Sequence, residues 1–201
     1  KVIQTINIAP HQIFQHGGVA GGGSGRPDWF WNPEQYGGIL CDIGSHQVDQ
    51  FLYFTGSTSG QVVASQVGNF KFPQYSTFED FGDMLLRGDR GTGYVRNDWY
   101  TPDGLSTWGD GRLVILGTEG YMEVRKNNDI TRAAGGSHLY LVDQKETRYI
   151  DCSQQELPYG RLLVDDVLNR TETSMPQAHV FLAMELALVA EAQATKLTLQ
   201  A

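Results

Sequence analysis

The sequence lacks the motifs that bind dinucleotides and nucleoside triphosphates. Nowhere does a strand pattern lead into Gly-x-Gly-x-x-Gly and a helix, with an acidic residue about 20 positions further on. The glycine-rich segment 17–25 is irregular, lacks the Gly-Lys-Ser/Thr of a P-loop, and is followed by Arg26 and Pro27 instead of a helix. We therefore expect a flexible loop or lid at segment 17–25, and we expect the cofactor site to lie outside this chain.

Basic charge, long apolar runs and cysteines are also scarce. The 15 Lys and Arg residues are scattered and outnumbered by 23 Asp and Glu, which leaves a net charge of −8 and argues against a nucleic-acid partner. No apolar run approaches the roughly 18 residues of a membrane span, and no signal segment opens the chain. Cys41 and Cys152 lack the spacing of a metal site or disulfide framework. We expect a cytoplasmic protein, although an export signal ahead of residue 1 would not be visible here.

Periodic segments indicate the fold class of the chain, whose 201 residues and 40% apolar content suit one domain with a proper core. Alternating apolar and polar residues predict strands at 1–9, 61–71, 78–87, 93–100, 112–116, 120–125, 138–142 and 147–150. Turn sequences at 88–91, 117–120 and 143–146 join neighbouring strands into hairpins. Helical spacing appears at 36–53, at 162–167 and from Pro176 to about Ala194. Because the strands cluster between helices, we predict an α+β fold, an open and largely antiparallel sheet with helices on one face.

Segment 36–53 carries the clearest chemical pattern. Read as a helix at about 100° per residue, it places Asp42, His46 and Asp49 with Tyr53 in a stripe about 60° wide. The opposite, core-like face consists of Leu40, Ile43, Gln47, Val48, Phe51 and Phe54. An Asp four residues before a His can hold the imidazole, fix its tautomer and raise its basicity, as a general base requires. A solvated helix face is the competing interpretation of the same stripe.

Glycines around this stripe favour the chemical interpretation. Gly37 and Gly38 stand at the entrance of the predicted helix, where missing side chains let a ligand approach the backbone N–H groups. Gly44 lies inside the helix, at a cost of about 1 kcal/mol relative to alanine. Such a cost indicates a packing or ligand requirement at Gly44.

At these residues the sequence resembles a known family. The Gly-Gly…Asp-x-x-x-His-x-x-Asp signature is similar to that of the Gfo/Idh/MocA oxidoreductases, the glucose-fructose oxidoreductase and inositol dehydrogenase group, and is carried here by Gly37, Gly38, Asp42, His46 and Asp49. Segment 26–32 is similar to the loop that precedes this helix in many members. Ile39 departs from the pattern, because many members have a third glycine there. The resemblance is strongest over about 26–56 and weaker over 96–126 and 158–199.

The resemblance implies that residues 1–201 form one substrate-binding and oligomerisation domain. Its fold would be similar to the C-terminal domains of dihydrodipicolinate reductase and glyceraldehyde-3-phosphate dehydrogenase. The N-terminal dinucleotide-binding domain of the family would be absent from this chain. The resemblance also implies an NAD- or NADP-dependent oxidoreductase acting on the CH–OH group of a sugar or polyol. His46 would be the general base, oriented by Asp42, and a lysine of the Glu-Lys-Pro motif missing here would share that role. This fragment alone is expected to be inactive. The open sheet face would form a homodimer or tetramer.

Further substrate contacts are expected outside the catalytic pair. The aromatic faces of Trp31 and Trp99 suit the C–H faces of a sugar, although both would serve equally as core or interface anchors. Arg96 and Asn97 are similar in position to substrate-facing strand residues of the family, and an exposed sheet edge would also explain them. Asp49 is either a substrate contact or an acid on the helix surface.

Two other functions remain compatible with these residues. The first is an NAD-dependent glycosidase of the same superfamily, in which tightly held NAD passes through a redox cycle while a glycosidic bond is cleaved. The second is a non-catalytic sugar-binding or assembly module. Asp42, His46 and Asp49 could form a facial set for a metal, but the other histidines show no matching spacing, so no metal is expected.

Overall fold

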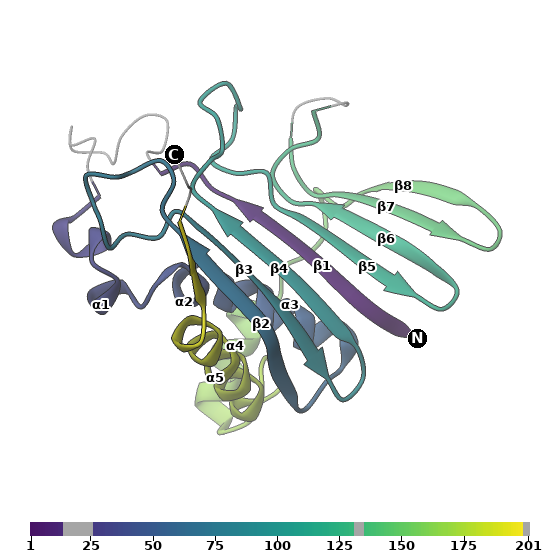
Figure 1. Ribbon diagram of the computed structural model, residues 1–201. Coiled ribbons are helices and arrows are strands. Elements are labelled where there is room, and N and C mark those ends of the chain that lie inside the picture. The colour runs from purple at the N-terminus through teal and green to yellow at the C-terminus, as the bar shows by residue number, and fades with distance from the viewer. Residues whose placement is uncertain (14–25, 131–134, 199–201) are drawn as a thin grey trace.

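The computed structural model describes residues 1–13, 26–130 and 135–198, so the loop predicted at 17–25 lies outside the described residues. Its centre is a nine-stranded sheet in the order β8-β7-β6-β5-β1-β4-β3-β2-β9 (Figure 1). The strands are β1 (Val2–Pro10), β2 (Gly60–Gly68), β3 (Phe81–Gly88), β4 (Thr92–Asp98), β5 (Arg112–Gly117), β6 (Gly120–Arg125), β7 (His138–Asp143), β8 (Thr147–Asp151) and β9 (Thr195–Leu197). The β1–β4 and β2–β9 pairs are parallel and the others antiparallel, which confirms the predicted sheet type.

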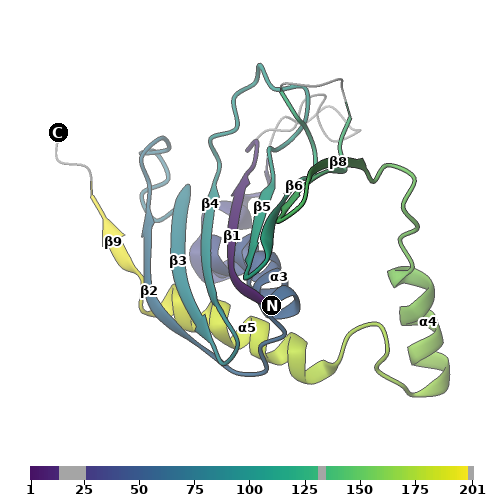
Figure 2. The same ribbon diagram turned by 90° about the vertical axis from the view of Figure 1, so that its right-hand side faces the viewer.

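The helices are η1 (Asp28–Trp31), α1 (Pro33–Tyr36), α2 (Ile39–Asp42), α3 (Gly44–Thr55), α4 (Tyr159–Asn169) and α5 (Gln177–Ala192). α2, α3 and α5 pack on one face of the sheet, above β1 to β4, as predicted (Figure 1). α4 lies apart from the sheet, at the end of a long connection from β8 (Figure 2). No helix in the described ranges combines the length and apolar character needed to cross a bilayer.

The predicted helix over 36–53 starts three residues later than expected. Gly37 and Gly38 have φ angles of 89° and 85°, in the left-handed region that a right-handed helix cannot use. The chain therefore ends α1 at Tyr36 and begins α2 at Ile39. A turn at Ile43 then separates α2 from α3, with the two segments following each other directly.

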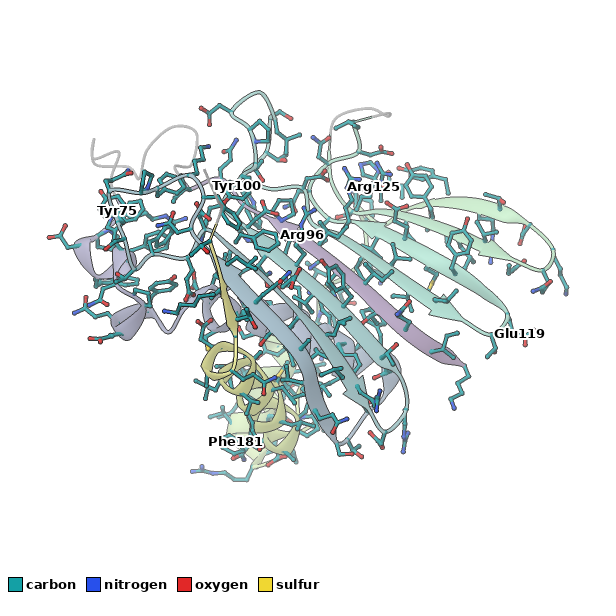
Figure 3. The ribbon with its side chains drawn as sticks, in the orientation of Figure 1. Tyr75, Arg96, Tyr100, Glu119, Arg125 and Phe181 are labelled. Atoms are coloured by element: carbon teal, nitrogen blue, oxygen red, sulfur yellow. The ribbon has the colours of Figure 1, made fainter. Side chains whose placement is uncertain are left out.

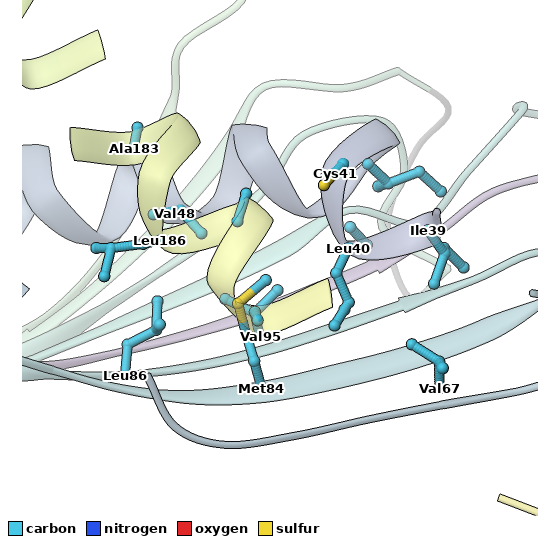
Figure 4. Packing of buried hydrophobic residues seen from close by; sticks show 14 of the residues in the cluster. Ile39, Leu40, Cys41, Val48, Val67, Met84, Leu86, Val95, Ala183 and Leu186 are labelled. Atoms are coloured by element: carbon cyan, nitrogen blue, oxygen red, sulfur yellow. The ribbon is translucent and has the colours of Figure 1, made fainter. Parts of the chain in front are cut away.

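The core lies between the sheet and these helices (Figure 4). Leu40, Val48 and Phe51 are fully buried, which confirms the apolar face predicted for this segment. A Cβ atom on Gly44 would lie 2.9 Å from Met84 Cε, so close packing of α3 on the sheet explains this glycine. Leu186 of α5, which packs beside α3, belongs to the same buried cluster.

The turn predictions are confirmed. The Gly88 N–H donates to the Gly91 carbonyl at 2.8 Å in the β3–β4 hairpin, and the Asp143 N–H donates to the Glu146 carbonyl at 3.1 Å between β7 and β8. The pattern missed η1, α1 and β9, because three- or four-residue elements are too short to show a period.

Candidate active site

Asp42, His46 and Asp49 lie on the outer face of α2 and α3, opposite the core. Asp42 and His46 are exposed, Asp49 is partly exposed, and Tyr53 is 73% exposed. The fully buried face beneath them holds the backbone of this segment in place. The predicted polar stripe therefore exists, on a rigid support.

Asp42 lies near the Arg26 guanidinium and the His46 ring. The surrounding protein raises the pKa of the Asp42 carboxyl, although part of it remains accessible, and the positive charges of Arg26 and His46 oppose this rise. Among the described residues no hydrogen bond joins Asp42 to His46, so their interaction in this state is electrostatic. The orientation of His46 by Asp42 stays a prediction.

Arg26 is a site residue that the sequence pattern did not single out. Its Nε donates to the Ile13 carbonyl at 3.0 Å. Its guanidinium lies 4.5 Å from the Phe30 ring centre and 4.9 Å from the Trp99 ring centre. This packing fixes a cation beside Asp42.

The two predicted tryptophans pack mainly within the protein. Trp99 is only 4% exposed and packs edge-on against Phe30 and His11. Trp31 is partly buried and stacks on Tyr75, with ring centres 3.9 Å apart. Contact of Trp31 or Trp99 with a substrate stays a prediction.

His11, at the end of β1, was also missed. Its Nδ1 lies 3.0 Å from the Ala9 carbonyl, so Nδ1 carries the hydrogen in the neutral ring and Nε2 is left as an acceptor. Burial lowers the pKa of His11, and Arg26, His46 and Lys126 lower it further. Arg26, His46 and Lys126 thus lie near enough to His11 to disfavour its protonated form.

Asp49 joins α3 to α5. Its carboxylate lies 2.6 Å from Nε2 of His179, in the first turn of α5. Asp49 also interacts electrostatically with Lys126, which follows β6. Burial lowers the pKa of the Lys126 ammonium, and the negative charge of Asp49 partly opposes this shift. The role of Asp49 as a substrate contact stays a prediction.

Gly38 makes room for the carboxylate of Glu191, whereas Gly37 packs against Cys41. The Ile39 N–H donates to Glu79 at 3.0 Å and the Leu40 N–H donates to Glu191 at 3.1 Å. Two of the backbone N–H groups at this helix entrance, those of Ile39 and Leu40, are thus already bonded. A role for Gly37 and Gly38 in substrate binding stays a prediction.

Arg96 and Asn97 point to opposite faces of β4. Asn97 is fully buried beneath α3, where its amide donates to Gln47 at 2.9 Å. Arg96 lies on the open face and forms an ion pair with Asp98 at 3.1 Å, close to Tyr100 (Figure 3). The sheet therefore separates Arg96 from the polar stripe on α2 and α3, and the period of two in a strand could have shown this.

A metal site is not formed by the described side chains. Over residues 1–13, 26–130 and 135–198, no three His, Cys, Asp or Glu side chains are arranged to hold an ion. The groups that do meet are suited to proton transfer and to polar binding of a small molecule.

Comparisons with known proteins agree with this architecture. The sequence model described as the GFO/IDH/MocA C-terminal domain matches residues 10–123. A crystal structure from Erwinia carotovora atroseptica, provisionally named an oxidoreductase, is 48% identical with a TM-score of 0.90, over 98% of this chain and 57% of that chain. None of the curated proteins matches the sequence.

More distant structures share the fold alone. An oxidoreductase from Agrobacterium radiobacter in complex with NAD+, L-tartaric acid and magnesium is 16% identical, with a TM-score of 0.66, over 96% of this chain and 55% of that chain. A myo-inositol dehydrogenase from Corynebacterium glutamicum is 16% identical, with a TM-score of 0.61, over 96% of this chain and 54% of that chain. The chain thus spans little more than half the length of these structures.

Proposed function

Because the chain belongs to the GFO/IDH/MocA C-terminal domain family, we propose that it is the substrate-binding and catalytic half of a cytoplasmic NAD- or NADP-dependent oxidoreductase. Its substrate would be a sugar or polyol, oxidised at a CH–OH group. The observation that carries the proposal is the exposed Asp42–His46 pair on a fully buried helix support, with Arg26 beside it. The names of the two distant structures, which mention tartaric acid and myo-inositol, agree with a small hydroxylated substrate.

The residues of this chain fit the proton-transfer half of the reaction. Neutral His46 would accept the hydroxyl proton of the substrate while the C–H bond beside it breaks, so that a carbonyl forms without a free alkoxide. Asp42 would stabilise the resulting imidazolium, and Arg26 would keep Asp42 ionised. Bound nicotinamide supplies the hydride acceptor of this reaction.

The start of α2 is a poor site for the phosphates of a dinucleotide. Its Ile39 and Leu40 N–H groups are bonded to Glu79 and Glu191, so these two donors are not available to a pyrophosphate. We therefore expect the isolated chain to bind NAD and NADP weakly or not at all. Tight stoichiometric NAD binding to this chain in titration calorimetry would contradict that expectation.

The activity test uses the full-length parent protein. Sugars, polyols and sugar acids are screened with NAD and NADP while the absorbance of the reduced nicotinamide is followed. We expect kcat to fall by about a hundredfold or more in His46→Ala, because a positioned general base contributes about that much. Ser45→Ala, on the same helix turn but outside the stripe, is the matched control and should keep the activity.

Each other outcome identifies an alternative. Release of reducing sugar without net reduction of the cofactor would identify the glycosidase. Binding of sugar without turnover, unaffected by His46→Ala, would identify a binding module. Activity that does not depend on His46 would contradict the assigned base.

We also propose a homodimer or tetramer through the open sheet face. Leu85 and Leu116 are 45% and 38% exposed there, beside half-buried Ile6 and Tyr94. Leu85→Lys should shift the mass measured by analytical ultracentrifugation toward the monomer, because it places a charge in the contact. An unchanged mass would contradict this interface.

A further inference from the structure

Two carboxyl groups meet at the start of the helix that carries Asp42. Glu79 lies in the connection before β3, and Glu191 lies in the last turn of α5. Glu79 accepts a hydrogen bond from the Ile39 N–H at 3.0 Å, and Glu191 accepts one from the Leu40 N–H at 3.1 Å. The first N–H groups of a helix have no partner inside it, so the pair satisfies two of them.

Gly38 brings Glu191 into this position. A Cβ atom on Gly38 would lie only 2.2 Å from the carboxyl carbon of Glu191. The carbonyl of Gly38 in turn accepts the Asp42 N–H at 2.9 Å. A continuous chain of contacts thus leads from Glu191 through Gly38 to the backbone of Asp42.

The carboxyl pair is largely shielded from water. Glu79 is only 6% exposed and Glu191 is partly buried. Burial, followed by the charge and the side-chain hydrogen bond of Glu79, raises the pKa of Glu191 to about 8. Two carboxylates that share a site disfavour each other's ionisation, which is the direction of the shift at Glu191.

The other groups around Glu191 act in the opposite direction. The Leu40 N–H bond and the charge of Lys196 of β9 lower the pKa of Glu191. Burial, with the charges of Glu79 and Glu191, raises the pKa of Tyr36 of α1 and of Cys41 of α2, so both side chains are neutral near pH 8 and add no charge. Retention of the proton therefore depends on burial and on Glu79.

We propose that Glu79 and Glu191 share one proton and together act as positioning residues for the Asp42–His46 site. While the proton is present, the pair holds the first turn of α2 and, through Gly38, the backbone of Asp42. Loss of the proton places two negative charges side by side, and their repulsion moves Glu191 away from Gly38. The inference on catalysis rests on the proposed function, whereas the shared proton does not.

Proton binding by Glu191 makes the free energy of unfolding depend on pH. The folded-state pKa of Glu191 is raised above its unfolded value, so the folded state binds more protons between about pH 4.3 and 8. Stability should fall as pH rises through this range and level off above it. In Glu191→Gln, whose amide resembles a protonated carboxyl and can still accept from Leu40, this contribution should be absent.

The decisive experiment follows the amide signals of Ile39 and Leu40 by NMR in the 201-residue chain from pH 4 to 10. We expect both signals to titrate with a midpoint near pH 8 in the wild type and to lose that step in Glu191→Gln. Glu185→Gln, on the exposed side of α5, is the matched control and should keep the wild-type midpoint. A single step between about pH 4 and 5 would overturn the proposal, since the carboxyls would then ionise like free ones.

A second measurement tests the link to catalysis in the full-length parent. The alkaline limb of kcat/KM should move upward by about one pH unit or more in Glu191→Gln, while Glu191→Ala, which leaves the Leu40 N–H without its acceptor, should lower kcat at all pH values. An alkaline limb that Glu191→Gln leaves in place would overturn the positioning role. Absence of any parent activity would contradict the proposed function instead, and the amide titration would still decide the shared proton.

Discussion

The two halves of the sheet are stabilised differently. β1 to β4 lie under α2, α3 and α5 and contribute, with these helices, most of the buried apolar cluster. β6, β7 and β8 contain no fully buried apolar side chain among the described residues. We call β5 to β8 the wing. The catalytic groups of the proposed reaction, Asp42 and His46, therefore lie on the half of the molecule that has a packed core. Lys126, which follows β6, belongs to the wing.

Polar contacts take the place of a core in β6, β7 and β8 of the wing, whereas β5 keeps buried Leu113 and Ile115. Arg125 pairs with Glu123 at 2.8 Å and with buried Asp129 at 3.0 Å, and Asp129 also accepts from the Tyr140 hydroxyl. The His138 ring lies 2.9 Å from the Tyr149 hydroxyl. Such contacts specify strand register, but each contributes less free energy than a buried aromatic side chain.

The largest effect is expected in the covered half. Phe51→Ala removes a fully buried ring and should lower the free energy of unfolding by about 3–5 kcal/mol. Tyr53→Ala, two residues along the same helix and 73% exposed, should change it by less than about 0.5 kcal/mol. Urea denaturation measures both. Equal losses would contradict the division between the helix faces.

A smaller and local effect is expected in the wing. Asp129→Ala leaves Arg125 and Tyr140 without their buried acceptor and should cost about 1–3 kcal/mol. Hydrogen exchange should show faster opening of β6, β7 and β8, with α3 still protected. Loss of protection throughout the chain would show that the wing and the covered half unfold as one unit.

His11 adds a pH dependence at the border of the two halves. Its pKa is lowered by burial, so the unfolded chain binds more protons than the folded one just below the unfolded value of about 6.5. The melting temperature should therefore fall as pH decreases from 7 to 5, and His11→Gln should reduce this slope. A slope that the variant leaves unchanged would contradict a neutral, buried His11.

The smallest effect on the fold is expected at α4. Asp166 accepts hydrogen bonds from the Thr171, Thr173 and Ser174 hydroxyls and so holds the turn between α4 and α5. Asp166→Ala should make segment 170–176 sensitive to limited proteolysis while the melting temperature of the covered half changes little. Asp165→Ala is the matched control, and cleavage at the wild-type rate in Asp166→Ala would contradict the role of this carboxylate.

Local patterns in the sequence determined most of the sheet, its hairpins and the polar stripe of α2 and α3. These features depend on residues a few positions apart, so a period of two, a turn pair or an i, i+4 spacing reveals them. The same pattern, applied strictly to β4, would have placed Arg96 and Asn97 on opposite faces. The roles of Asp42 and His46 depend on a substrate and stay predictions.

Only the tertiary structure decided which distant residues meet at the stripe. His179 reaches Asp49 because α5 packs beside α3, and Glu79 and Glu191 meet because the connection before β3 and the end of α5 converge on Gly38. The parallel β1–β4 pair likewise joins segments far apart in the chain. The helix and strand periods of the sequence cannot predict such contacts, because the contacts form only when separate elements bury their apolar faces against a common sheet.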